Sequence, residues 1–189
     1  MRPLSLRQLT LTGLLAALAM ALGATGLGFI PVPTPGQALT LMPIPVILAG
    51  LIAGPVSGAL VGGLFGCFCL LRGFAPPDPI VQVLPRLLVG VVAWGIYVRF
   101  LAWRPTAWRA AAVTATVMAS LFHSTMVLGL VAWMGYFPTQ AALITWVLHG
   151  PLEAGIAAIV TIPALTAARA LKISLIPAGL TSPQGPGSC

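Results

Sequence analysis

Apolar residues run along this chain in long stretches, separated by short polar or Pro/Gly-rich segments. Six stretches predict helices, at residues 9–30, 37–54, 56–71, 80–103, 107–134 and 140–172. At 1.5 Å per residue the second and third reach only about 27 and 24 Å, less than the roughly 30 Å hydrocarbon core of a bilayer. Helices this short favour burial against their neighbours. The pattern predicts an all-α integral membrane protein with six transmembrane helices in one domain, residues 1–176.

The segments between these stretches are rich in proline and glycine. Proline fixes φ and lacks a backbone donor, so residues 31–37, 72–79 and 135–139 are predicted to be loops. Residues 177–189 are rich in Pro, Gly and Ser and are predicted to be a disordered tail. The first apolar stretch is longer than the roughly 7–15 residue core of a signal peptide, so we expect a retained helix.

The composition excludes several classes of protein. Only 6% of the residues are charged, against about 25% in soluble domains. Two acidic residues leave no carboxylate pair for acid/base chemistry and no acidic metal site, and the cysteines lack a zinc-site spacing. There is no Walker A motif. We expect no catalytic residue, metal or cofactor, so that any ATP hydrolysis belongs to partner subunits.

The basic residues lie mostly on one side of the predicted spans. Seven share that side: Arg2, Arg7, Arg99, Arg104, Arg109, Arg169 and Lys172. Arg72 lies in an opposite loop, and Arg86 lies about 10 Å into the fourth helix from its outer end. Because cytoplasmic loops carry an excess of Arg and Lys, both termini are predicted to be cytoplasmic. This membrane role accounts for the positive charge without a nucleic-acid partner.

Four ionisable side chains fall inside the predicted spans: Arg86, His123, His149 and Glu153. Burying such a group without a partner is costly, so each is a functional candidate. His149 and Glu153 are four residues apart and share one face of a helix. Three interpretations are open. The groups form a structural network that neutralises Glu153, they line a ligand cavity, or the two histidines and Glu153 form a proton relay.

Aromatic residues give a second set of candidates. Most Trp and Tyr residues lie near predicted helix ends, where an interfacial belt would place them. Trp133, Tyr136 and Trp146 are on the outward side and are also candidates to stack on a ligand. Aromatic residues are otherwise few, which argues against a large flavin or folate as ligand.

Small residues recur every four positions in the first span, at Gly13, Ala17 and Ala21. This spacing forms a smooth groove that lets helices pack closely. The groove suits either internal packing or the docking of another membrane protein.

A series of motifs follows this small-residue face in a characteristic order. They occupy residues 41–50, 54–55, 58–66, 77–79, 84–90 and 150–154, the last with a Gly-x-x-Glu-Ala pattern. From about residue 9 to residue 170, this order resembles the S components of energy-coupling factor (ECF) vitamin transporters. The resemblance implies a substrate-binding subunit in a bacterial or archaeal plasma membrane. Its partners would be a transmembrane coupling subunit and two ABC-type ATPases.

The resemblance also implies roles for particular residues. The outward loops would close over a vitamin, with Pro33, Pro35, Gln37, Pro77 and Asp78 as gating residues. Gly13, Ala17 and Ala21 would dock the coupling subunit. The S component would then topple in the membrane and carry its site inward, and ATP hydrolysis would reset the complex.

The basic residues on the outward half bear on the substrate. Arg86 and Arg72 suit an anionic ligand through charge-assisted hydrogen bonds, so a pantothenate-like acid is the first expectation and a cobalamin-type ligand the second. Two other functions remain as alternatives. One is a non-transporting membrane scaffold or assembly protein, and the other is a proton-coupled secondary carrier that uses His123, His149 and Glu153.

Overall fold

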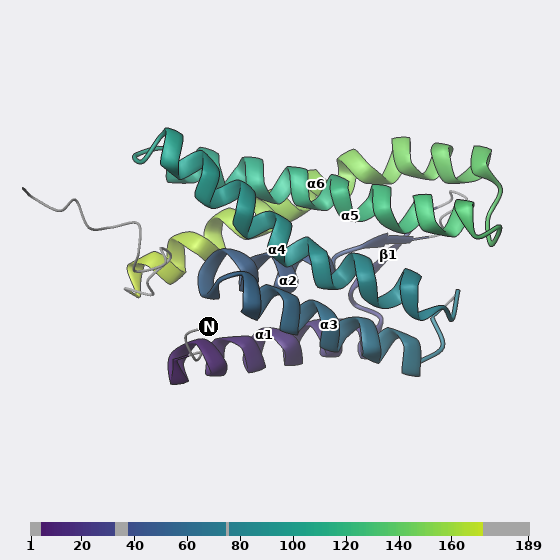
Figure 1. Ribbon diagram of the computed structural model, residues 1–189, viewed down its shortest axis with the longest axis horizontal. Helices are drawn as coiled ribbons and strands as arrows, with labels where there is room; N and C mark the ends of the chain where they lie inside the picture. Colours follow the sequence, from purple (N-terminus) through teal and green to yellow (C-terminus); the bar gives the residue numbers. More distant parts are fainter. Residues whose placement is uncertain (1–4, 33–37, 75, 172–189) are drawn as a thin grey trace, which may run out of the picture.

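The computed structural model describes residues 5–32, 38–74 and 76–171, and these contain six helices and one two-stranded hairpin (Figure 1). The helices are α1 (Leu6–Thr25), α2 (Pro43–Ala53), α3 (Pro55–Leu71), α4 (Pro79–Trp103), α5 (Trp108–Trp133) and α6 (Thr139–Ala170). The antiparallel strands β1 (Phe29–Pro31) and β2 (Ala38–Thr40) lie between α1 and α2. The predicted helical class is confirmed, with this hairpin as an addition.

The hairpin corrects two predicted helix ends. We expected the first helix to reach residue 30 and the second to begin at residue 37, and both predictions are wrong. Gly26 adopts a left-handed conformation with φ of 75° and ends α1 at Thr25, as glycine does at many helix ends. The second helix begins only at Pro43, where a first-turn proline gives up no intrahelical bond.

The first helix begins at Leu6, three residues before the predicted start, and the remaining helix ends agree with the sequence prediction to within two residues. Pro55 and Pro79 each occupy the first position of their helices, which is the position that tolerates proline best. The predicted tail, residues 177–189, lies outside the described residues, as do Arg2 and Lys172.

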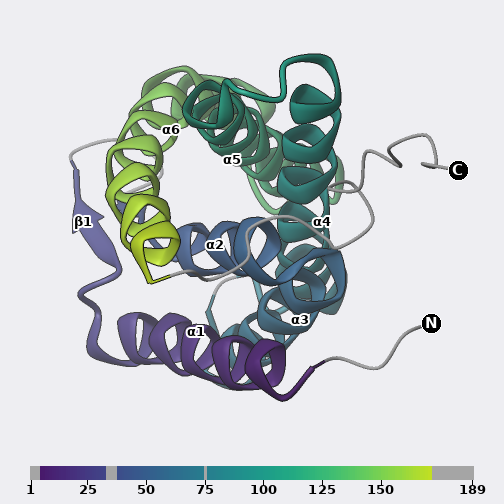
Figure 2. The same ribbon diagram turned by 90° about the vertical axis from the view of Figure 1, so that its left-hand side faces the viewer.

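Four of the six helices, α1, α4, α5 and α6, are long and apolar enough to cross a membrane. The helices α2 and α3 are also apolar but have only 11 and 17 residues. Ten residues of α2 are buried, because this helix packs against each of the other five (Figure 2). The four long apolar helices indicate a multi-pass membrane protein. The transmembrane placement of α2 and α3 stays a prediction.

Both ends of the described chain lie at one end of the bundle. In Figure 1 the start of α1 and the end of α6 are on the left, and the turns after α2 and α4 lie there too. The hairpin and the α3–α4 and α5–α6 connections lie toward the opposite end. Three connections thus gather where a site can be built from distant parts of the sequence.

Glycines on α3 set the position of α4. A Cβ atom at Gly62 would overlap the backbone oxygen of Arg86, and one at Gly66 would lie 2.7 Å from the backbone oxygen of Gln82. Only glycine lets two backbones approach this closely. The side chains of Gln82 and Arg86 therefore start from a helix that is tightly fixed against α3.

Candidate functional site

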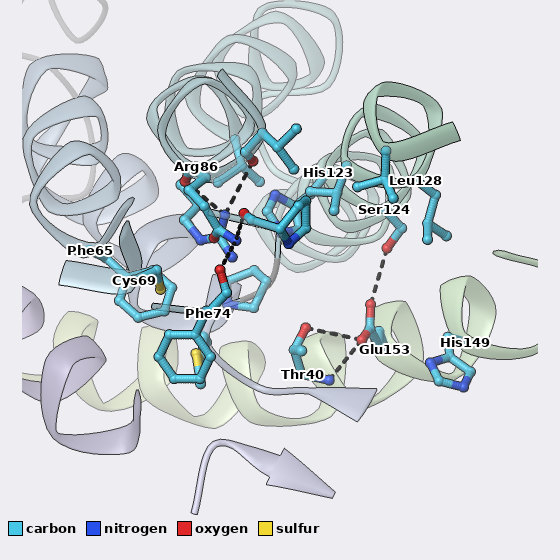
Figure 3. A pocket seen from close by; sticks show the side chains of 18 of the residues that line it. Thr40, Phe65, Cys69, Phe74, Arg86, His123, Ser124, Leu128, His149 and Glu153 are labelled. Carbon is cyan, nitrogen blue, oxygen red and sulfur yellow. Dashed lines mark hydrogen bonds between the residues drawn. The ribbon is translucent and has the colours of Figure 1, made fainter. Parts of the chain in front are cut away.

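A cavity of about 630 Å³ lies toward the end of the bundle that holds the hairpin (Figure 3). Its lining residues come from α2 to α6, from both strands and from the α3–α4 and α5–α6 connections. The volume falls within the roughly 300–1,000 Å³ typical of small-molecule sites. Of the residues singled out in the sequence, six line it: Pro77, Arg86, His123, Tyr136, His149 and Glu153.

Arg86 lies in the wall formed by α4. Its Nη1 donates to the backbone oxygens of Gln82 at 2.7 Å and Val81 at 3.4 Å. The guanidinium lies over the ring of Phe65, 5.5 Å from its centroid, a position that permits a cation–π interaction. Its Nε has no hydrogen-bond partner in the described part of the chain. The guanidinium is therefore held in place while part of its donor capacity is unused.

Gln82 is a site residue that the sequence reasoning missed. Its side chain is 3% exposed, and its Nε2 donates to the backbone oxygens of Phe74 at 3.1 Å and Pro76 at 2.9 Å. These bonds fasten the α3–α4 connection to α4. Its Oε1 is buried and has no partner among the described residues. A lone neutral amide in an apolar helix carries no sequence signal that separates it from other polar residues.

Glu153 joins three elements at the opposite wall, as Figure 3 shows. Its Oε1 accepts from the backbone N and the Oγ1 of Thr40, at 2.7 and 3.0 Å. Its Oε2 accepts from the Oγ of Ser124 at 3.1 Å. The carboxylate thus links β2, α5 and α6.

His123 and His149 both line the cavity and are 8% and 4% exposed. His149 and Glu153 lie on the same side of α6, as their spacing predicts (Figure 3). His123 comes from α5 and lies near Arg86 in the same view. Its Nδ1 is buried without a partner among the described residues, so its hydrogen-bonding capacity is not exhausted.

Asp78 and Tyr136 connect two segments at the mouth of the cavity. The Tyr136 hydroxyl donates to Asp78 Oδ2 at 3.3 Å. Asp78 Oδ1 accepts from the backbone N of Ile80 at 2.8 Å and of Val81 at 3.4 Å, so it caps α4. An N-cap Asp followed by a first-turn proline is a recognisable helix start. One carboxylate therefore anchors both the helix and the α5–α6 connection.

Several predicted residues are not brought to the cavity. Arg72 is exposed at the end of α3, and Trp133 is 81% exposed; neither lines the cavity. Trp146 is also absent from the lining, and its Nε1 donates to Thr125 Oγ1 at 2.9 Å. Pro33, Pro35 and Gln37 lie outside the described residues.

The lining holds more aromatic rings than we expected. Five line the cavity: Phe29, Phe65, Phe74, Tyr136 and Phe137. Phe29 and Phe74 lie with their centroids 5.4 Å apart, although they come from different connections. The expectation of few aromatic residues at the site was wrong, because the fold brings together phenylalanines from β1, α3 and two connections. A ligand with a flat ring fits this wall.

The arrangement suits binding of a small molecule that has both polar and apolar parts. Among the described residues no group of three or more His, Cys, Asp or Glu side chains is placed to hold a metal ion. The cavity offers a guanidinium and an imidazole on one side, and a carboxylate, hydroxyls and an imidazole on the other. Aromatic rings complete the wall beside Arg86 and Cys69.

Comparison with known proteins agrees with this geometry. The family model described as "ECF transporter, substrate-specific component" matches residues 7–165. The match includes all the cavity-lining residues, which run from Phe29 to Glu153. None of the curated proteins compared with the chain matches it.

Proposed function

Because this chain belongs to the substrate-specific components of ECF transporters, we propose that its cavity captures a small micronutrient from outside the cell. Proteins of this family are membrane subunits that bind substrate and are not ATPases themselves. Membership also implies association with a module of a transmembrane coupling subunit and ATPases. The further proposal concerns which substrate the cavity takes and how it is delivered.

The observation that carries the substrate proposal is the guanidinium of Arg86 in the cavity wall. A fixed guanidinium at a largely apolar site favours a carboxylate or phosphate through charge-assisted hydrogen bonds. We therefore propose an acidic vitamin, with a pantothenate-like acid first. Donors on such a ligand would be recognised by Glu153, Ser124 and their neighbours at the opposite wall.

A cobalamin-type ligand is the second candidate. A cavity of about 630 Å³ has the size of a site for a drug-sized molecule, and a complete corrinoid is considerably larger. The volume therefore favours the small acid. Because aromatic rings line the cavity, a compact acid that contains a ring also fits the proposed class of ligand.

Delivery is proposed to use the small-residue face of α1. Gly13, Ala17 and Ala21 are exposed in the described structure, and none of them lines the cavity. A Cβ at Gly13 would meet no atom within 4 Å, so this face is open for close approach of another helix. We propose that the coupling subunit docks here. All six helices would cross a bacterial or archaeal plasma membrane with both termini cytoplasmic, and the subunit would topple to release its ligand.

The test is direct binding by the purified protein. Mass spectrometry of small molecules that the protein retains on purification should find a compound with a carboxylate or phosphate. Equilibrium binding with tritiated pantothenate should then be saturable. Retention of a cationic or uncharged compound, with no saturable pantothenate binding, would overturn the substrate proposal.

A further inference from the structure

Arg86 directly follows a proline inside a helix. Pro85 lies within α4 and is buried. A residue at this position would normally donate its backbone N–H to the carbonyl four positions earlier, which is that of Val81. Proline has no such donor. The Val81 carbonyl, in the first turn of α4, is therefore left without its usual helical partner at a buried position.

The Arg86 side chain reaches this carbonyl with the longer of its two backbone contacts. Its Nη1 lies 3.4 Å from the Val81 oxygen and 2.7 Å from the Gln82 oxygen. Long side chains on helices point toward the N-terminus, so the next residue after proline is well placed to reach back. A freed carbonyl within a membrane helix has to be satisfied locally. Pro85 thus leaves the Val81 carbonyl without a backbone donor, and Arg86 supplies a side-chain donor to the same carbonyl.

The two backbone contacts of the Arg86 guanidinium both come from Nη1. Nη1 is occupied by the two carbonyls, whereas Nε is without a partner in the described part of the chain. The side chain also meets the Cys69 thiol and the Phe65 ring from α3. A guanidinium in the cavity wall attracts a carboxylate or phosphate through charge-assisted hydrogen bonds.

We propose that Pro85 is a positioning residue for Arg86, an inference that rests on the proposed anion-binding function. Because Pro85 has no backbone N–H, the Val81 carbonyl remains available to the guanidinium. The guanidinium is then held against its own helix in the wall of the cavity, where it attracts the anionic group of the ligand. A restored N–H at position 85 would compete for that carbonyl and release the side chain to other rotamers.

The first test is a double-mutant cycle on tritiated pantothenate binding. Pro85→Ala should raise the dissociation constant at least fivefold, without lowering the melting temperature, because alanine repairs the helix. In an Arg86→Ala background the same change should alter affinity less than twofold, since the two residues act as a unit. Pro163→Ala is the matched control, because Pro163 lies inside α6 and does not line the cavity. It should leave affinity unchanged.

A second readout needs no ligand. With Cys67 and Cys189 replaced by alanine, Cys69 is the only thiol of the chain, and it lines the cavity. The guanidinium of Arg86 contacts this thiol, so its release should change the surroundings of the thiol. The rate of alkylation by N-ethylmaleimide should therefore change at least threefold in Pro85→Ala, as in Arg86→Ala, and not in Pro163→Ala.

The outcomes separate the two proposals. Wild-type alkylation in Pro85→Ala, or equal effects of Pro85→Ala with and without Arg86, would overturn the positioning role. Absence of pantothenate binding by the wild type would count against the proposed substrate, and the alkylation rates would still decide the role of Pro85. If Pro85→Ala does not yield monodisperse protein, Pro85→Ser supplies the same N–H and is compared in the same way.

Discussion

The carboxylate of Glu153 in α6 accepts two hydrogen bonds from Thr40 in β2, a residue 113 positions earlier. The hairpin to which Thr40 belongs has three residues in each strand. An isolated hairpin is at best marginally stable in water, so contacts outside the sheet have to hold it. Glu153 supplies one such contact at the edge of the cavity, and thereby fixes the α1–α2 connection near the site.

Removing this acceptor should loosen the hairpin. Glu153→Ala takes away the partner of the Thr40 N–H, the Thr40 hydroxyl and the Ser124 hydroxyl. A hydrogen bond to a charged group is worth about 1.5–3 kcal/mol. We expect amide exchange in residues 38–41 to rise at least tenfold, as measured by hydrogen–deuterium exchange mass spectrometry. Thr40→Val keeps the backbone donor and should give a smaller rise. Equal exchange in Glu153→Ala and the wild type would show that the contact does not hold the hairpin.

The packing of α3 on α4 makes a sharp prediction for two adjacent glycines. A methyl group at Gly62 would overlap the Arg86 backbone oxygen, whereas one at Gly63 would meet only Leu87 Cδ1 at 3.9 Å. Gly62→Ala should therefore destabilise the protein by about 1–3 kcal/mol through overpacking. Gly63→Ala should be neutral or slightly stabilising, because alanine favours helix. Thermal unfolding in detergent measures both, and similar melting temperatures for the two variants would contradict the close approach.

The exposed face of α1 is predicted to be a docking surface for the coupling subunit. Gly13→Leu or Ala17→Leu would place a large side chain on this face without a clash inside the subunit, since both positions are exposed. We expect each variant to bind ligand normally and to lose co-purification with the coupling subunit and ATPases. Gly155→Leu is the matched control, because Gly155 is exposed on α6 with open space around it. Normal assembly of the α1 variants would refute the docking assignment.

The sequence predicted the helices well because long apolar stretches bounded by proline and glycine leave few alternatives. It failed at the hairpin for a physical reason. Strands of three residues are too short to show an alternating pattern, and the contact that holds β2 comes from Glu153, far away in the sequence. A tertiary partner, which no local pattern reveals, decides the structure there.

The difference between local sequence pattern and tertiary contact also explains which site residues could be predicted. Arg86, His123, His149 and Glu153 could be selected because an ionisable group in a membrane span is unusual. Gln82 and Phe74 could not, since an amide and a phenylalanine are ordinary in such a chain, and only the fold brings both to the cavity. Trp133 and Arg72 were selected by their place along the chain, but both are exposed in the fold and neither lines the cavity.

The central claim is that Arg86 recognises the anionic group of the substrate inside the cavity. The most direct measurement is the dissociation constant of tritiated pantothenate for the wild type, Arg86→Ala and Arg104→Ala. Arg104 is a matched control because it is exposed beyond the end of α4, over the ring of Trp103. Loss of a charged hydrogen bond should weaken binding by about tenfold or more in Arg86→Ala, with Arg104→Ala unchanged. Affinity within about twofold of the wild type in Arg86→Ala would contradict the account.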